Sequence, residues 1–98
     1  MTCRGIYLEN VDDIPEIELL LYYLGYNIIT PNFTSTLKKK VPCYLYLYSI
    51  GNKNGHTQVN KDRSVTISEK RLVISSKTYE KIKYTSIQDL RSLSKADV

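Results

Sequence analysis

The sequence predicts an α+β domain in which helices cover one face of a mainly antiparallel sheet of four to six strands. Two patterns carry this prediction. Tyrosine occupies every second position within residues 43–50, which is the period of a strand. Isoleucine and leucine recur at helical spacing over residues 14–24, and the run ends at Gly25, a residue suited to closing a helix. The length of 98 residues is that of a single domain, residues 1–98.

The N-terminal half is predicted to place this helix between two strands. Residues 4–9 form a short β-rich run and are expected to be the first strand. Residues 10–13 follow as a turn whose aspartates can cap the helix. Residues 26–30 are expected to be the second strand, ended by Pro31, and residues 32–40 a loop.

The C-terminal half is predicted to add a hairpin and a short helix. Residues 64–67 and 71–75 are β-rich and flank a polar turn, so we expect them to pair as a hairpin. Residues 79–84 alternate like a strand and residues 86–93 open with a helix cap, although one continuous helix over residues 77–94 is an alternative. The nearest common architecture is a ferredoxin-like sandwich, yet no second helix is predicted where that fold needs one.

The charge is unevenly distributed along the chain. Residues 1–37 carry one basic and five acidic side chains, whereas residues 38–98 carry thirteen basic and five acidic ones, which gives the net charge of +4. Such asymmetry is typical of contact with a polyanion, and the alternative is simple solvation of a small surface. We find no apolar run of about 20 residues and no secretory signal, so we expect an intracellular, cytoplasmic protein without a membrane partner.

The residues that carry catalysis or bind metals are sparse. Cys3 and Cys43 lack the spacing of a metal or redox motif, and we expect reduced thiols, with a disulfide between them as the alternative. His56 is the only histidine and lies in a polar turn over residues 51–56. We therefore expect no catalytic residues, no metal and no cofactor, and a protein that is not an enzyme.

The alternating strand suggests a binding surface. Its leucines are expected to face the core, which places the tyrosines about 7 Å apart on the other face, where they can stack on successive bases. Nearby lysines can then hold phosphates. If a helix or a partner covers the tyrosines instead, they belong to a core or an interface. The candidate nucleic-acid or partner surface comprises Lys38, Lys39, Lys40, Tyr44, Tyr46, Tyr48 and Lys53.

Two segments carry a family resemblance. Residues 6–11 (IYLENV) resemble the first-strand motif of RNA recognition motif domains, and residues 40–47 resemble their third-strand motif. The resemblance implies that Tyr7 and Tyr44 would be base-stacking positions. The sequence departs from the pattern at residues 41–42, where the motif has glycine and an aromatic residue.

The predicted N-terminal helix is apolar nearly all round. Leu19, Tyr22 and Tyr23 lie off the stripe that would dock on the sheet. A helix of this kind is either deeply buried or covered by another chain. We therefore expect this face to mediate a homodimer or another partner contact, unless the tyrosine hydroxyls simply reach water.

These observations predict a small, basic, non-catalytic binding protein. A compact chain rich in Ile, Lys, Asn and Tyr and without motifs fits an accessory protein of a virus or mobile element. Such a protein would act as an inhibitor that occupies a surface of a host protein or nucleoprotein complex in nucleic-acid or defence machinery. The alternative is a module that binds RNA or single-stranded DNA directly through a sheet face of lysine and tyrosine.

Overall fold

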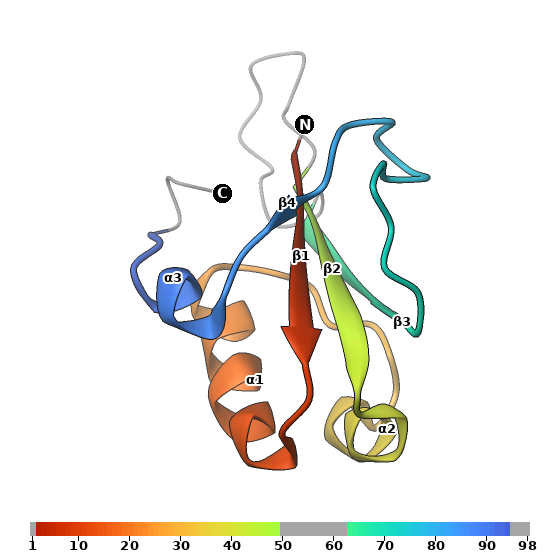
Figure 1. The fold of residues 1–98 in the computed structure, drawn as a ribbon. Helices are drawn as coiled ribbons and strands as arrows, with labels where there is room; N and C mark the ends of the chain where they lie inside the picture. The colour runs from red at the N-terminus through yellow and green to blue at the C-terminus, as the bar shows by residue number, and fades with distance from the viewer. Residues whose placement is uncertain (1, 50–62, 95–98) are drawn as a thin grey trace.

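The computed structural model describes residues 2–49 and 63–94, which form one mixed sheet with helices (Figure 1). Strand β2 is antiparallel to β1 and β3, and β4 is parallel to β1, in the order β3-β2-β1-β4. The predicted α+β class is thus confirmed. In chain order the elements are β1 (Thr2–Leu8), the 3-10 turn η1 (Val11–Asp13), α1 (Ile14–Tyr23), α2 (Phe33–Lys40), β2 (Cys43–Ser49), β3 (Arg63–Ser68), β4 (Lys83–Tyr84) and α3 (Ile87–Arg91).

Helix α1 begins and ends close to where its sequence predicts, but the expected capping is not seen, since Asp13 at the N-cap makes no side-chain hydrogen bond to the helix. Pro15 lies in the first turn, where its missing N–H costs nothing. Ile14, Ile17 and Leu21 are buried along one stripe. Gly25 follows the helix with a φ of 85°, a left-handed conformation that a side chain would disfavour. The stripe docks α1 on the sheet.

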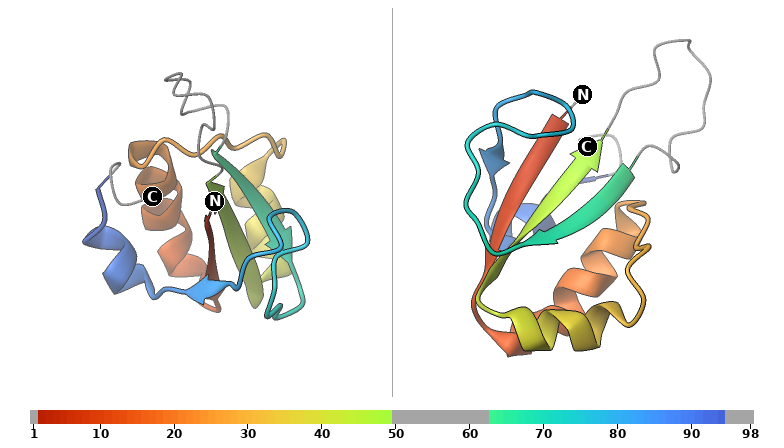
Figure 2. Two further views of the ribbon diagram at one scale, coloured as in Figure 1. Left: turned by 90° about the horizontal axis from the view of Figure 1, so that it is seen from above. Right: turned by 90° about the vertical axis from the view of Figure 1, so that its right-hand side faces the viewer.

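Strand β2 separates two apolar cores, one on each face of the sheet. Leu45 and Leu47 are fully buried on the face that α1 and α2 cover, in a helix-side core that includes Ile6 and Leu21. The predicted facing of the two leucines is confirmed. The opposite face is covered by the covering segment, residues 69–82, which lies on the other side of the sheet from the helices in the right-hand view of Figure 2.

The prediction of a strand over residues 26–30 and a loop over residues 32–40 is wrong. The amide of Tyr26 still closes α1 by donating to the Leu21 carbonyl (3.0 Å), and only Asn27 bridges to β3 before the chain reaches Pro31. Residues 33–40 form α2. Phe33 and Leu37 lie four positions apart, one turn of helix, and both are buried, so two apolar residues suffice to dock it.

The predicted hairpin between residues 64–67 and 71–75 does not form. Instead, the two ends of the segment 73–82 pair with each other. Ile74 forms an antiparallel bridge with Lys81, and the Ile82 amide donates to the Val73 carbonyl (2.9 Å). The predicted strand over residues 79–84 shortens to β4.

Residues 83–91 then form a short strand and a helix rather than one continuous helix, as predicted. Ser86 caps α3 by accepting a hydrogen bond from the Asp89 amide (3.1 Å). The parallel β1–β4 pair is not expected in an antiparallel ferredoxin-like sheet, so that topology is not confirmed. The predicted turn over residues 51–56, with Lys53 and His56, lies outside the described residues.

Replacing Leu45 with alanine should lower the free energy of unfolding by about 2–5 kcal/mol, because a fully buried side chain leaves a cavity. Chemical denaturation followed by circular dichroism measures this loss. Thr66→Ala, at an exposed position of β3, is the matched control and should change stability by no more than about 0.5 kcal/mol. Equal losses in the two variants would contradict the assigned facing of β2.

Candidate binding surfaces

The tyrosine face of β2 is covered rather than open. Tyr46 is 1% exposed and Tyr48 is 3% exposed, and both pack with Cys3 and Ile82 in the second core. Of the two alternatives that the sequence allows, packing therefore applies to Tyr46 and Tyr48. Neither ring can stack on a base while the covering segment is in place.

Two tyrosine hydroxyls hold the covering segment. The Tyr46 hydroxyl donates to the Lys70 carbonyl and accepts from the Leu72 amide (2.8 Å). The Tyr84 hydroxyl donates to the Leu72 carbonyl (2.6 Å). Each hydroxyl has one proton, so their mutual contact at 3.1 Å is not a third bond in this arrangement. We call this set, Tyr46 and Tyr84 with the backbone at residues 70 and 72, the tyrosine clamp.

Gly5 makes room for the tyrosine clamp. It lies opposite Tyr46 on β2 and opposite Tyr84 on β4. A Cβ atom at Gly5 would come within 2.6 Å of Cε1 of Tyr84, closer than carbon atoms approach without moving. Gly5 is therefore needed because of the space that the Tyr84 ring fills.

The two cysteines are free and buried. In the β1–β2 register Cys43 lies opposite Leu8, so it is five strand positions away from Cys3, about 17 Å. This separation is too long for a disulfide. Burial raises the pKa of both thiols, which leaves them protonated at neutral pH and poor nucleophiles.

The structure places the lysine run across the sheet from Tyr46 and Tyr48. Lys38, Lys39 and Lys40 are exposed in the last turn of α2, where positive charge complements the negative end of the helix dipole. Helix α2 packs into the helix-side core, across the sheet from Tyr46 and Tyr48. The lysines therefore favour the end of α2 electrostatically, and they do not share a surface with Tyr46 or Tyr48.

Part of the tyrosine face does stay accessible, at the end of β1. Tyr7 is 45% exposed, and its ring lies 4.9 Å from the half-buried ring of Tyr44. These are the two positions that the resemblance to RNA recognition motif domains implies as stacking residues.

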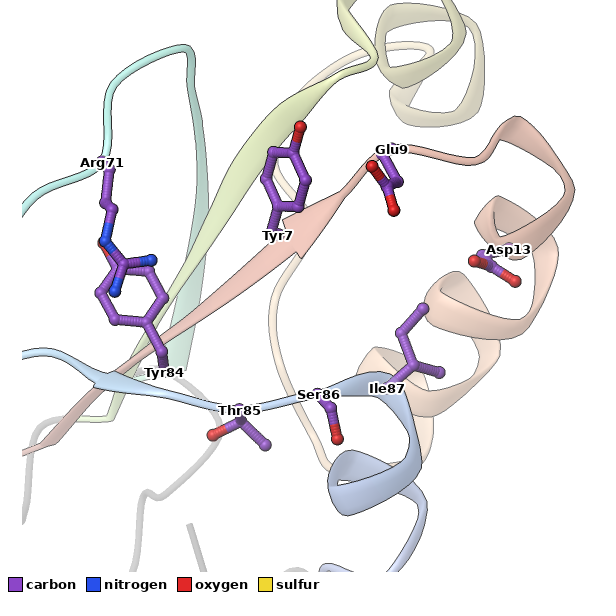
Figure 3. Close-up of a pocket in the computed structure, with 8 residues that line it drawn as sticks. All are labelled: Tyr7, Glu9, Asp13, Arg71, Tyr84, Thr85, Ser86 and Ile87. Atoms are coloured by element: carbon purple, nitrogen blue, oxygen red, sulfur yellow. The ribbon is translucent and has the colours of Figure 1, made fainter.

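A cleft of about 390 Å³ opens beside Tyr7 (Figure 3). It lies where the end of β1, the start of α1 and the β4–α3 connection meet. The guanidinium carbon of Arg71 lies 3.9 Å from the centre of the Tyr84 ring. The residues that line the cleft are Tyr7, Glu9, Asp13, Arg71, Tyr84, Thr85, Ser86 and Ile87.

A second accessible surface is the outer side of α1. Leu19, Tyr22 and Tyr23 are 71%, 82% and 62% exposed. At about 100° per residue these positions share one face, directly opposite the buried stripe. We call them the α1 outer face. The expectation that they lie off the docking stripe is confirmed.

Carboxylates flank the α1 outer face on both sides. By the same helical geometry Glu18 lies along one edge and Glu16 along the other. Glu18 accepts a hydrogen bond from the Thr34 hydroxyl (2.6 Å). Glu16 forms a bidentate ion pair with Arg91 of α3, and these hydrogen bonds lower the pKa of Glu16. Both edges of the α1 outer face are therefore polar, and hydrogen bonds hold their carboxylates in place. Glu16 is paired with a positive charge, so the negative charge of this rim is at Glu18.

Comparison with protein-family models, with curated proteins and with solved structures finds no match for this chain. Within residues 2–49 and 63–94, no three His, Cys, Asp or Glu side chains gather as a metal site would require. In the same part of the chain, no helix has the length and apolar character needed to cross a bilayer. The candidate sites are therefore judged from their geometry.

The sequence did not single out Gly5, Arg71 or Tyr84 as parts of one site. Gly5 carries the signal that could have found them, because glycine inside a strand marks the close approach of another group. The identity of that group depends on β4, which pairs with β1 through only two residues.

Replacing Gly5 with alanine should destabilise the fold by about 1–3 kcal/mol, since the new methyl group overlaps the Tyr84 ring. Combining it with Tyr84→Ala should remove most of this penalty, because the overlapping ring is gone. Thermal melts of the two single variants and the double variant give the coupling. Strictly additive losses would show that Gly5 is needed for some other reason.

Proposed function

We propose that this chain is a small, non-catalytic protein-binding module that docks on its partner through the α1 outer face. The observation that carries the proposal is the exposure of Leu19, Tyr22 and Tyr23 on a helix whose opposite side is fully buried. Exposed apolar side chains grouped on one helix face are typical of protein interaction sites.

The α1 outer face has the chemistry of an interface centre. Burying a large apolar side chain contributes about 1.5–3 kcal/mol, and tyrosine is enriched among residues that dominate binding energy. Helix α1 is already fixed by its buried stripe, so docking would order few additional groups. An apolar helix face fits the mode in which a helix lies in a groove of its partner.

The acidic rim favours a basic partner. Glu18 borders the α1 outer face, and Asp12 and Asp13 precede the helix. Complementary charge guides association, whereas a symmetric dimer through this face would bring like charges together. Basic surfaces are typical of proteins that bind nucleic acids. We therefore place the partner among host proteins of nucleic-acid or defence machinery, with this chain as an accessory protein of a virus or mobile element.

Direct binding of RNA or single-stranded DNA is the weaker proposal. With Tyr46 and Tyr48 buried, it would rest on phosphate contacts from Lys38, Lys39 and Lys40 and on Tyr7 and Tyr44 alone. Retention on heparin or on a single-stranded oligonucleotide across a salt series measures any such binding.

A photoreactive phenylalanine analogue at position 22 should cross-link one host protein in cells, and the same analogue at position 79 should not. Tyr79 is the matched control, because its side chain is 83% exposed on the covering segment. The purified partner should then bind the Tyr22→Ala variant about 30-fold more weakly than the wild type, the loss expected of an interface hot spot. Tyr79→Ala should bind like the wild type.

Two results would contradict the proposal. Unchanged affinity of both Tyr22→Ala and Leu19→Ala would remove the α1 outer face from the interface. Concentration-dependent self-association in sedimentation, abolished by Leu19→Glu, would make the partner a second copy of the chain instead of a host protein.

A further inference from the structure

The cleft beside Tyr7 contains one aromatic ring that carries a guanidinium and one that does not. Arg71 lies over the Tyr84 ring at 3.9 Å from its centre. The neighbouring Tyr7 ring has no cation over it among the described residues, although it lines the same cleft and is 45% exposed. In Figure 3 the Tyr7 ring stands between the Arg71–Tyr84 pair and the Glu9 carboxylate.

The charges of the cleft favour a cation. Its lining includes one cationic side chain, Arg71, and two carboxylates, Glu9 and Asp13. Asp13 interacts electrostatically with Arg91, which itself forms an ion pair with Glu16. Glu9 makes no ion pair within residues 2–49 and 63–94. A phosphate group would meet two like charges here, whereas a cation would meet an available carboxylate and an aromatic ring.

We propose that this cleft receives an arginine side chain of the partner protein, which stacks on Tyr7 and pairs with Glu9. A planar guanidinium can lie on an aromatic ring and still direct two N–H groups at a carboxylate, whereas a lysine ammonium is a compact, strongly hydrated charge. Arg71 over Tyr84 is the same arrangement within the chain itself.

The inference rests on the proposed function, since it names a second contact made by the partner that covers α1. Asp13 lines the cleft and directly precedes α1, so Tyr22 lies nine residues further on, about 14 Å along the helix. An interface of ordinary size, about 800 Å² on each side, is wide enough to span this distance. The basic partner favoured by the rim of α1 is also the kind of protein that presents arginine.

The test is a nuclear magnetic resonance titration of the folded chain with the blocked peptide acetyl-Gly-Arg-Gly-amide. Saturable shifts are expected at the Tyr7 ring and the Glu9 and Ser86 amides, with a dissociation constant on the order of millimolar for so small a probe. The same peptide with citrulline, which keeps the shape but lacks the charge, should bind several-fold more weakly.

Substitutions separate the two contacts. Tyr7→Leu should weaken binding of the arginine peptide about two- to fivefold, because it removes the aromatic ring on which the guanidinium stacks. Glu9→Gln should weaken binding of the arginine peptide about threefold by removing the charge, and it should reduce the preference over citrulline to the part that the Tyr7 ring contributes. Both positions are exposed, so the variants should fold, and Glu69→Gln, at an exposed carboxylate outside the cleft lining, is the matched control.

An absence of saturable shifts, or equal binding of the arginine and citrulline peptides, would overturn the inference. Neither result depends on the α1 outer face, because the peptide is too short to reach it. Leu19→Ala should leave binding of the peptide unchanged but weaken binding of the complete partner protein. Failure of this inference and failure of the proposed function therefore give different results.

Discussion

The tyrosine clamp is the interaction on which the rest of the structure depends. Two hydroxyls from β2 and β4 bind the backbone at Lys70 and Leu72 and hold the covering segment against the sheet. The clamp is possible only because Gly5, between these strands, leaves space for the Tyr84 ring. Both hydroxyls donate their protons to backbone carbonyls, and burial raises the pKa of Tyr46, which keeps that hydroxyl protonated at neutral pH. These hydrogen bonds keep the covering segment on the tyrosine face of β2, so Tyr46 and Tyr48 form a second core there.

Closing that face determines where binding can occur. The sheet has α1 and α2 on one side and the covering segment on the other, which leaves neither face available as an open platform. Apolar side chains stay exposed on the outside of α1 and at the end of β1, where Tyr7 borders the cleft. These two places are joined by the start of α1, and both carry carboxylates. They form the acidic part of a chain whose net charge is positive, which is why we favour a basic protein partner over a nucleic acid.

The sequence predicts the parts of this fold that local periodicity determines. The buried stripe of α1, the facing of Leu45 and the cap at Ser86 follow from spacing alone. Helix α2 was missed because two apolar residues among lysines and threonines give too weak a period. The hairpin prediction failed for a different reason, because hydroxyls from distant tyrosines compete for the backbone of residues 70–72. Period two also cannot distinguish an open strand face from a covered one, so the accessible Tyr7 and the buried Tyr46 look alike in the sequence.

Hydrogen exchange at the Leu72 amide tests the tyrosine clamp most directly, because this amide donates to the Tyr46 hydroxyl and to no backbone carbonyl of the sheet. If the clamp closes the tyrosine face, the Leu72 amide exchanges as slowly as the amides that pair β1 with β2, and Tyr46→Phe accelerates it while the β1–β2 amides stay protected. Exchange of the wild-type Leu72 amide at the rate of an unprotected loop, beside a protected sheet, would contradict the account and return the tyrosine face to the candidates for binding.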